Sequence, residues 1–279
     1  MSLTAVRPKE TAARAVNELR PLSLELGGLS RADGGSSFAF GSTAAAASVS
    51  GPIEVRLNAE LPSRATLEVN MRPSAGVSST FEKRYSKDIR EVLEQVLGLS
   101  HHPRTLVQVV IQALSAQSPQ NWKASRYSGD ASDTVATSSR RVSLNPSLIA
   151  ACVNATSLAF INASSIPMRG TLCAVAVGKL TSDSRTVSSL REGQTMGKAQ
   201  LVLDPGTEEI EDGWAIFAFV FGATFNGGPN MQGCEVVWAD CHGLASEDEY
   251  AEAQQLALLG ATSIERHIRQ ELSKIGGSR

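Results

Sequence analysis

The chain has no large excess of charge of either sign. Its 279 residues include 26 Lys and Arg against 28 Asp and Glu, which gives a formal net charge of −2. No global basic field therefore indicates a nucleic-acid ligand, and any contact with RNA would have to come from a local patch. Hydrophobic residues make up 42% of the chain, which is enough for a full buried core.

The sequence also lacks the usual patterns of metal sites, disulfide frameworks and membrane spans. The cysteines form no CxxC pair and have no clustered histidines, so we predict no metal and no cofactor. We interpret all four as reduced core residues, which favours an intracellular protein. No run of about 18 apolar residues occurs, and the N-terminus has no apolar signal-peptide core, so we expect neither secretion nor a membrane span. The cysteines are Cys152, Cys173, Cys234 and Cys241.

The strongest local pattern is a helix that begins at Asn145. Asn145 is a favourable N-cap, and Pro146 suits the first helical position because its missing N–H needs no partner there. Small and apolar residues follow as far as Pro167, which biases Ile166 away from helical geometry and ends the helix near residue 164. Apolar residues at helical spacing with alanines between them predict close packing on a sheet. Taken alone, the segment is a core helix.

Short strands and helices make up the rest of the pattern. Between residues 22 and 72 the predicted strands are LSLEL, SSFAF, ASVSG, IEVRLN and TLEVNMR. A further strand is predicted after residue 104, with the sequence TLVQVVIQAL. Four more are predicted after the buried helix: TLCAVAVG, AQLVLD, WAIFAFVF and CEVVWADC. An amphipathic helix is expected over residues 79–97, and a capped terminal helix from Ser246 to Gly276. This order predicts an α+β fold.

We predict one domain over residues 21–279. Residues 1–20 are charged and alanine-rich, and the sequence leaves open a short helix, a docking arm or a mobile tail. Between Ser115 and Arg141 the composition becomes too polar to bury its own surface and too long for an ordinary connection. We therefore expect a flexible insertion at about 115–145, to which the sequence assigns no role.

Short motifs in a fixed order resemble those of the RNase PH family of phosphate-dependent 3′ to 5′ exoribonucleases. The main ones are RADGGS at 31–36, GPIE at 51–54, IREVLE at 89–94, HPRT at 102–105, VNA at 153–155, SLA at 157–159, IPM at 166–168 and LDP at 203–205. Each is common alone, but the series spans most of the chain. The resemblance implies an RNase PH-like domain, of the ribosomal protein S5 domain 2-like fold, with mixed and antiparallel sheets packed with helices.

Within this family the chain is most similar to eukaryotic exosome ring subunits, in particular the type numbered forty-six in yeast nomenclature. The likeness lies in Met71-Arg72-Pro73, in the short loop to Tyr85 and in residues 148–155. It implies a ring of six RNase PH-like subunits around an RNA channel, with RNA-binding cap subunits on one face and a hydrolytic exoribonuclease on the other. It also implies RNA processing and decay, including rRNA processing, in the nucleus, the nucleolus and the cytoplasm.

Phosphorolysis brings phosphate against an RNA phosphodiester, so it needs positive charge and N–H donors at one place. Active family members carry an arginine at the start of the central helix and two aspartates spaced six residues apart. Aligned without a gap on Asn154, the chain has Ile149 at the arginine position, where no hydrogen bond can be donated. Asp204 retains the first aspartate, but Ile210 occupies the second. We therefore predict a degenerate site and a non-catalytic homologue.

Several alternatives stay open. Arg140 or Arg141 could reach the phosphate position in a gapped alignment, although a long flexible loop would hold phosphate poorly. Glu208 or Glu209 could supply the missing carboxylate after a shift of register, and Asp204 could simply be a turn residue. An active phosphorolytic 3′ to 5′ exoribonuclease is therefore the alternative function, and an unrelated metabolic enzyme on the same architecture is a third hypothesis.

A local basic patch lies between residues 72 and 90, with five cations against two carboxylates. Such a patch suits sequence-independent and salt-sensitive contacts with RNA phosphates. We predict Arg72, Lys83 and Arg84 as the RNA-binding residues, because the family's corresponding loop lies near the RNA path. Lys87 and Arg90 fit a solvated helix face at least as well.

The remaining aromatic and imidazole side chains give no site in the sequence. Trp122, Trp214 and Trp238 are too scattered to predict a stacking platform. His101 and His102 fit a turn better than a metal site.

Overall fold

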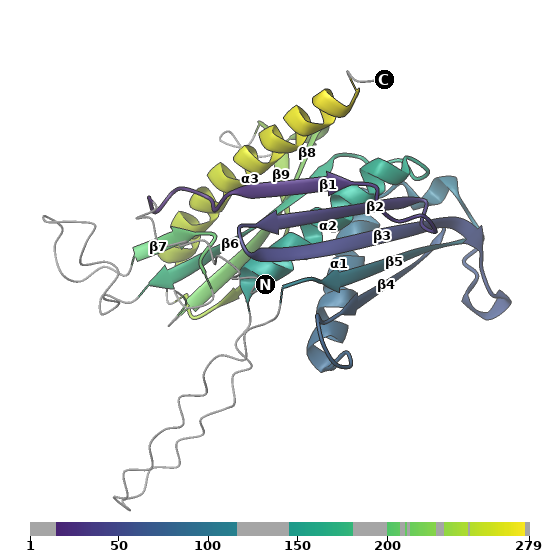
Figure 1. Ribbon diagram of the computed structural model, residues 1–279, viewed down its shortest axis with the longest axis horizontal. Coiled ribbons are helices and arrows are strands. Elements are labelled where there is room, and N and C mark those ends of the chain that lie inside the picture. The colour runs from purple at the N-terminus through teal and green to yellow at the C-terminus, as the bar shows by residue number, and fades with distance from the viewer. Residues whose placement is uncertain are drawn as a thin grey trace, which may run out of the picture.

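The computed structural model describes residues 15–115, 145–180, 200–206, 210, 213–226, 232–244 and 246–276. They form two β-sheets with helices between and outside them (Figure 1). The expected insertion falls almost entirely outside the described residues, as do Arg140, Arg141, Glu208 and Glu209.

The first sheet has the strand order β1-β2-β3-β5-β4. Its strands are β1 (Leu22–Leu26), β2 (Gly34–Phe40), β3 (Thr43–Glu54), β4 (Thr66–Arg72) and β5 (Thr105–Ala113). The pairs are antiparallel except β4 and β5, which are parallel and are connected through helix α1 (Thr80–Val96). Parallel neighbours need such a crossover.

The prediction of two separate strands at ASVSG and IEVRLN was wrong. A single strand, β3, runs on through Gly51 and Pro52, with a register shift between Ser50 and Ile53. The segment Leu57–Ala59 is a 3₁₀-helix. The alternation of polar and apolar residues did not predict this strand correctly, because an irregular β-ladder can continue across glycine and proline residues that usually end a strand.

The second sheet has the order β7-β6-β8-β9, and all its described pairs are antiparallel. Its strands are β6 (Thr171–Leu180), β7 (Gln200–Leu203), β8 (Gly213–Asn226) and β9 (Gln232–His242). Helix α3 (Glu247–Gly276) packs on one face of this sheet, where Gly260 lies against Leu203 and Val175. One of the two bonds of the capping box predicted at Ser246 is present, because Ser246 Oγ accepts the N–H of Glu249 at 3.2 Å. The Glu249 carboxylate accepts from Lys179 Nζ at 2.9 and 3.0 Å.

Helix α2 (Pro146–Ala163) lies between the two sheets and joins them. Toward the first sheet, Ser36 Oγ donates to the carbonyl of Ala155 at 2.6 Å. Toward the second, Asn154 both accepts from and donates to the backbone of Ala174, at 2.6 and 2.9 Å. By length and composition α2 could cross a membrane, but 83% of it is buried inside the protein. It is the central core helix that the sequence predicted.

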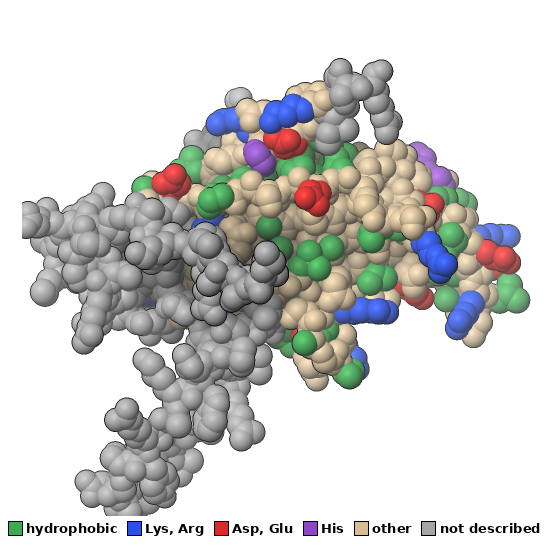
Figure 2. Space-filling model, viewed as in Figure 1, with side chains coloured by type: hydrophobic (Ala, Val, Ile, Leu, Met, Phe, Trp, Pro, Cys, Tyr) green, Lys and Arg blue, Asp and Glu red, His purple; other side chains and the backbone are tan. Residues whose placement is uncertain are grey.

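The outer face of the first sheet carries small and polar side chains. In β3 the outward positions Ala44, Ala46 and Ser48 alternate with buried inward ones. Figure 2 shows this face of the molecule, with most of its charged side chains toward the margins. The predicted basic patch therefore does not lie on this sheet face, except for Arg72 at the end of β4.

The cysteine prediction holds for three of the four residues. Cys152, Cys173 and Cys234 are buried and free, whereas Cys241 is free but exposed. The prediction of a core position for Cys241 was wrong because β9 is the edge strand of the second sheet and Cys241 lies one residue from its end.

Candidate active site

The first turn of α2, where family members bind phosphate, is occupied by groups of this chain. Asn145 Oδ1 accepts the N–H of Leu148 at 3.3 Å, and Ser147 Oγ donates to the carbonyl of Pro205 at 3.0 Å. Asn145 and Ser147 are both buried, and Pro146 has no N–H to offer. Donors that could hold an anion at a helix N-terminus are thus partly missing and partly engaged within the protein.

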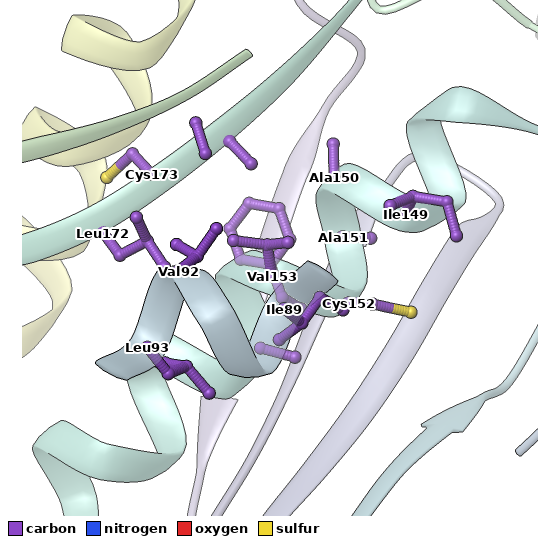
Figure 3. Packing of buried hydrophobic residues seen from close by; sticks show 14 of the residues in the cluster. Ile89, Val92, Leu93, Ile149, Ala150, Ala151, Cys152, Val153, Leu172 and Cys173 are labelled. Atoms are coloured by element: carbon purple, nitrogen blue, oxygen red, sulfur yellow. The ribbon is translucent and has the colours of Figure 1, made fainter. Parts of the chain in front are cut away.

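Ile149 lies one turn into α2 and belongs to the hydrophobic core. Its side chain is fully buried. Figure 3 shows Ile149 and Cys152 directed to one side of α2, with Leu172 and Cys173 of β6 on the other. The position that the alignment gives to a phosphate-binding arginine is therefore filled by core packing in this chain.

Asp204 is retained, but it is bound by Arg20. Arg20 Nε lies 2.7 Å from Asp204 Oδ2, and Arg20 Nη2 lies 2.6 Å from Oδ1. The Asp204 side chain is fully buried, and that of Arg20 is 13% exposed. Planar two-point pairing of this kind is among the strongest hydrogen-bonded interactions of a carboxylate. Arg20 Nη1 also donates to Thr43 Oγ1 at 3.1 Å, so the pair connects the end of β7 to the first sheet.

The backbone of Asp204 supports the turn interpretation as well. Its φ of 49° lies in the left-handed region, which aspartate tolerates better than most residues. Its N–H donates to the carbonyl of Ala176 at 2.8 Å. Asp204 is both a turn residue and one half of a buried ion pair.

The sequence analysis missed Arg20 because it separated residues 1–20 from the domain. Arg20 and Asp204 are 184 residues apart, and no local pattern connects them. The N–H of Leu203 donates to the carbonyl of Val16 at 3.0 Å, so the described part of this segment runs along β7.

Ile210 is half-buried beside Pro205, and both lie over Gly178 of β6. A methyl group added to Gly178 would come within 2.8 Å of the Pro205 ring and 3.6 Å of Ile210 Cγ1. The carbonyl of Pro205 contacts Ser147 at the start of α2, and Ile210 lies with Pro205 over Gly178. Position 210, where the ungapped alignment places the second carboxylate, is therefore apolar.

The three predicted RNA-binding residues are near one another in sequence but differ in their surroundings. Arg72 is exposed at the end of β4 and lines an open groove of about 470 Å³ with residues 73–78 and Gln112. Lys83 is exposed on α1. In the part of the chain that the structure describes, neither has a carboxylate within ion-pair distance.

Arg84 is already paired. Its Nη2 lies 3.0 Å from each carboxylate oxygen of Asp240 on β9, and its Nε lies 3.6 Å from Asp88. Although burial of Arg84 opposes its charge, the carboxylate of Asp240 raises the pKa of its guanidinium. Its charge is thus largely balanced by the protein, and Arg72 and Lys83 are the better candidates for RNA phosphates.

A family model described as the 3′ exoribonuclease family, domain 1 (RNase PH), matches residues 18–165, more than half of the chain. The chain belongs to the RNase PH family. Within that family it is 43% identical over 89 residues to the exosome complex component rrp46 of Schizosaccharomyces pombe, a match that spans 32% of this chain and 39% of that protein. To the component RRP46 of Saccharomyces cerevisiae it is 28% identical over 249 residues, 88% of this chain and 92% of that one.

Other RNase PH family members share the fold more widely. The exosome complex component Rrp41 of Archaeoglobus fulgidus is 29% identical over 93% of this chain and 84% of its own. The crystal structure of rice (Oryza sativa) Rrp46 superposes with a TM-score of 0.65 at 23% identity, over 93% of this chain and 98% of that one. An archaeal exosome core superposes at 0.58 with 15% identity, over 92% and 89%. The prediction of an RNase PH-like α+β fold is confirmed.

Proposed function

We propose that the chain is a non-catalytic ring subunit of the RNA exosome core. Its similarity to Rrp46 components of two yeasts and its fold, which matches exosome core structures, support a place in such a ring. The state of the degenerate site supports the absence of phosphorolysis.

The observation that carries this proposal is the pairing of Asp204 with Arg20. A carboxylate acting in acid–base catalysis must reach the reacting group, whereas both oxygens of Asp204 are held by the guanidinium of the half-buried Arg20. The two other family positions hold Ile149 in the core and the apolar Ile210. No cation among the described site residues is free to offset the charge of two phosphate groups.

In the assembly we propose, the chain contacts other RNase PH-like exosome subunits in a six-membered ring. RNA-binding cap subunits would lie on one face, and a hydrolytic exoribonuclease would receive RNA threaded through the channel. The work of the complex would be RNA processing and decay in the nucleus, including the nucleolus, and in the cytoplasm. Arg72 and Lys83 would contact the phosphates of the RNA as the RNA passes through the channel.

The alternative function is a phosphorolytic 3′ to 5′ exoribonuclease. Similarity to archaeal Rrp41 over 93% of the chain favours it, and one structural match is an Archaeoglobus fulgidus exosome with RNA bound to the active site. In this alternative, Arg140 or Arg141 would bind phosphate and Glu208 or Glu209 would provide the carboxylate.

The two functions differ in one product. The purified chain, alone and combined with RNase PH-type ring subunits, should release no nucleoside diphosphates from RNA when phosphate is added, while an active RNase PH enzyme serves as the positive control. Native mass spectrometry should show the chain incorporated into a six-membered ring. Phosphate-dependent release that is lost in an Arg140→Ala or Arg141→Ala variant would establish the alternative.

The proposed RNA contacts have their own test. Arg72→Ala and Lys83→Ala should each weaken RNA binding by the ring and reduce the slope of log affinity against log salt by about one. Arg90→Ala is the matched control, because Arg90 is on the same helix as Lys83 but faces Glu94 at 3.8 Å. Equal effects of all three variants would contradict the assignment.

A further inference from the structure

Trp214 and His242 form an aromatic pair on the second sheet. They are direct cross-strand partners on β8 and β9, with ring centroids 6.0 Å apart and ring planes 17° from parallel. Trp214 is half-buried and His242 is exposed. No stacking platform was predicted from the sequence, because its three tryptophans are far apart in the chain. The ring that stacks on Trp214 is a histidine from the neighbouring strand.

This pair is continuous with the degenerate site. On its other side Trp214 pairs with Gly178 of β6, and the space over Gly178 is filled by Pro205 and Ile210. Pro205, Trp214 and His242 therefore lie in one row across the end of the sheet. The row is on the face that carries α2, since Pro205 accepts from Ser147 of that helix.

The row is suited to a flat aromatic ligand more than to phosphate. A proline ring, an isoleucine, an indole and an imidazole offer dispersion and stacking but no positive charge that would hold an anion by itself. On α1, Arg84 binds Asp240, which precedes His242 by two residues on the same strand face. Because Asp240 balances the charge of Arg84, the preceding helix residue, Lys83, is the cation that remains for an RNA phosphate. Stacking surfaces beside basic residues are how proteins bind single-stranded nucleic acid without reading its sequence.

We propose that Trp214 and His242 form a stacking site for a base of single-stranded RNA. The choice of RNA as ligand rests on the proposed function, whereas the site itself rests on the ring geometry. In this arrangement the imidazole is the exposed outer plane, and the indole holds it in position from below. The site would bind an RNA base next to Pro205 and Ile210, where the predicted catalytic groups are absent.

The test measures binding of labelled RNA decamers to the full-length chain by fluorescence anisotropy. Loss of a stacking partner costs about 5- to 150-fold in affinity, so His242→Ala should weaken binding of oligoadenylate within that range. His242→Phe should restore most of the affinity because it retains an aromatic plane. His101→Ala, another exposed histidine, is the matched control and should leave binding unchanged. An abasic decamer with the same phosphates should bind more weakly and should not distinguish His242→Ala from the wild type.

Several results would overturn the proposal: equal binding of oligoadenylate by His242→Ala and wild type, equal binding of abasic and adenylate decamers by the wild type, or no RNA binding at all. A His242→Ala variant that binds RNA normally but fails to join ring subunits would show a protein contact instead. Release of nucleoside diphosphates would contradict only the proposed lack of catalysis, so the two failures are distinguishable.

Discussion

Arg20 and Asp204 form a buried two-point ion pair between the segment that precedes β1 and the end of β7, with N–O distances of 2.6 and 2.7 Å. The family resemblance presents Asp204 as a remnant of catalysis. The geometry of Asp204 supports a structural role. Its partner Arg20 also donates to Thr43 Oγ1, so the ion pair links the two sheets. The burial of this carboxylate and its two-point pairing with Arg20 support the proposal that it stabilises the fold.

Removing Arg20 should therefore destabilise the protein strongly. Arg20→Ala removes the two-point ion pair of the buried Asp204 carboxylate, and breaking a buried pair costs about 3–5 kcal/mol. Urea denaturation followed by circular dichroism gives the free energy of unfolding. Arg64→Ala is the control, because Arg64 is 46% exposed in its pair with Glu94 and should cost at most about 1 kcal/mol. A similar decrease in the free energy of unfolding in both variants would show that the buried pair stabilises the protein no more than the exposed one.

The start of α1 gives a pH-dependent prediction. The Glu82 carboxylate accepts the N–H of Ser79 at 2.7 Å, and Ser79 Oγ also donates to it. Burial pushes the pKa of Glu82 up, but the hydrogen bonds from Ser79 and the backbone outweigh it, and the pKa ends below its ordinary value of 4.5. A lowered pKa means that the carboxylate stabilises the fold above pH 4.5 and that this contribution is lost as the pH falls.

Glu82→Gln should accordingly lower the free energy of unfolding at pH 7 by about 0.5–2 kcal/mol, the range measured for capping interactions. The difference from the wild type should shrink as the pH is lowered from 5 toward 3. Denaturation curves at several pH values measure it, with Glu91→Gln on the exposed side of α1 as the control. A difference that stays constant with pH would contradict the role given to the ionised carboxylate.

The cysteines should differ in their reaction with iodoacetamide. Burial raises the pKa of the Cys152 thiol to about 12 and leaves it without access to reagent. Burial and the neighbouring Asp240 raise the pKa of the exposed Cys241 to about 11, so its thiolate is scarce at neutral pH. Mass spectrometry of the folded protein should find slow labelling of Cys241 that accelerates as the pH rises, and all four cysteines should react in urea. Labelling of the folded Cys241→Ser variant at a comparable rate would contradict this.

Two adjacent glycines of β2 should respond differently to alanine. A methyl group at Gly34 would lie 2.3 Å from the carbonyl oxygen of Ala159 and 2.7 Å from the backbone nitrogen of Ala163, so β2 and α2 would have to separate. At Gly35, on the opposite face, the nearest atom is the flexible end of Leu29 at 3.0 Å. Gly34→Ala should cost about 1–3 kcal/mol of stability or more, and Gly35→Ala clearly less. Thermal denaturation of both variants is sufficient, and equal melting temperatures would refute the close approach of helix and strand.

Much of the fold could be predicted from the sequence where the signals are local. Asn145, Pro146 and Pro167 bracket α2, and the helix runs as expected from Pro146 to Ala163. The amphipathic helix predicted over residues 79–97 is helix α1, Thr80–Val96. Caps, proline geometry and periodicity act within a few residues, so they are readable without the rest of the chain.

The candidate site was less predictable. The sequence placed Ile149, Asp204 and Ile210 at family positions, but it could not show that Ile149 is turned into the core or that Arg20 holds Asp204. Nor could it pair Trp214 with His242, because the partner of a strand residue depends on sheet order and register.

By itself, the sequence determined the family, the α+β class and the presence of isoleucine at positions 149 and 210, because these depend on residue identity and order. Only the tertiary structure decided what the remaining groups do. A carboxylate is catalytic or structural according to the charge beside it, and two rings make a platform only when two strands bring them into register. Both relationships join residues far apart in the chain, and it is their distance in space that fixes the chemistry.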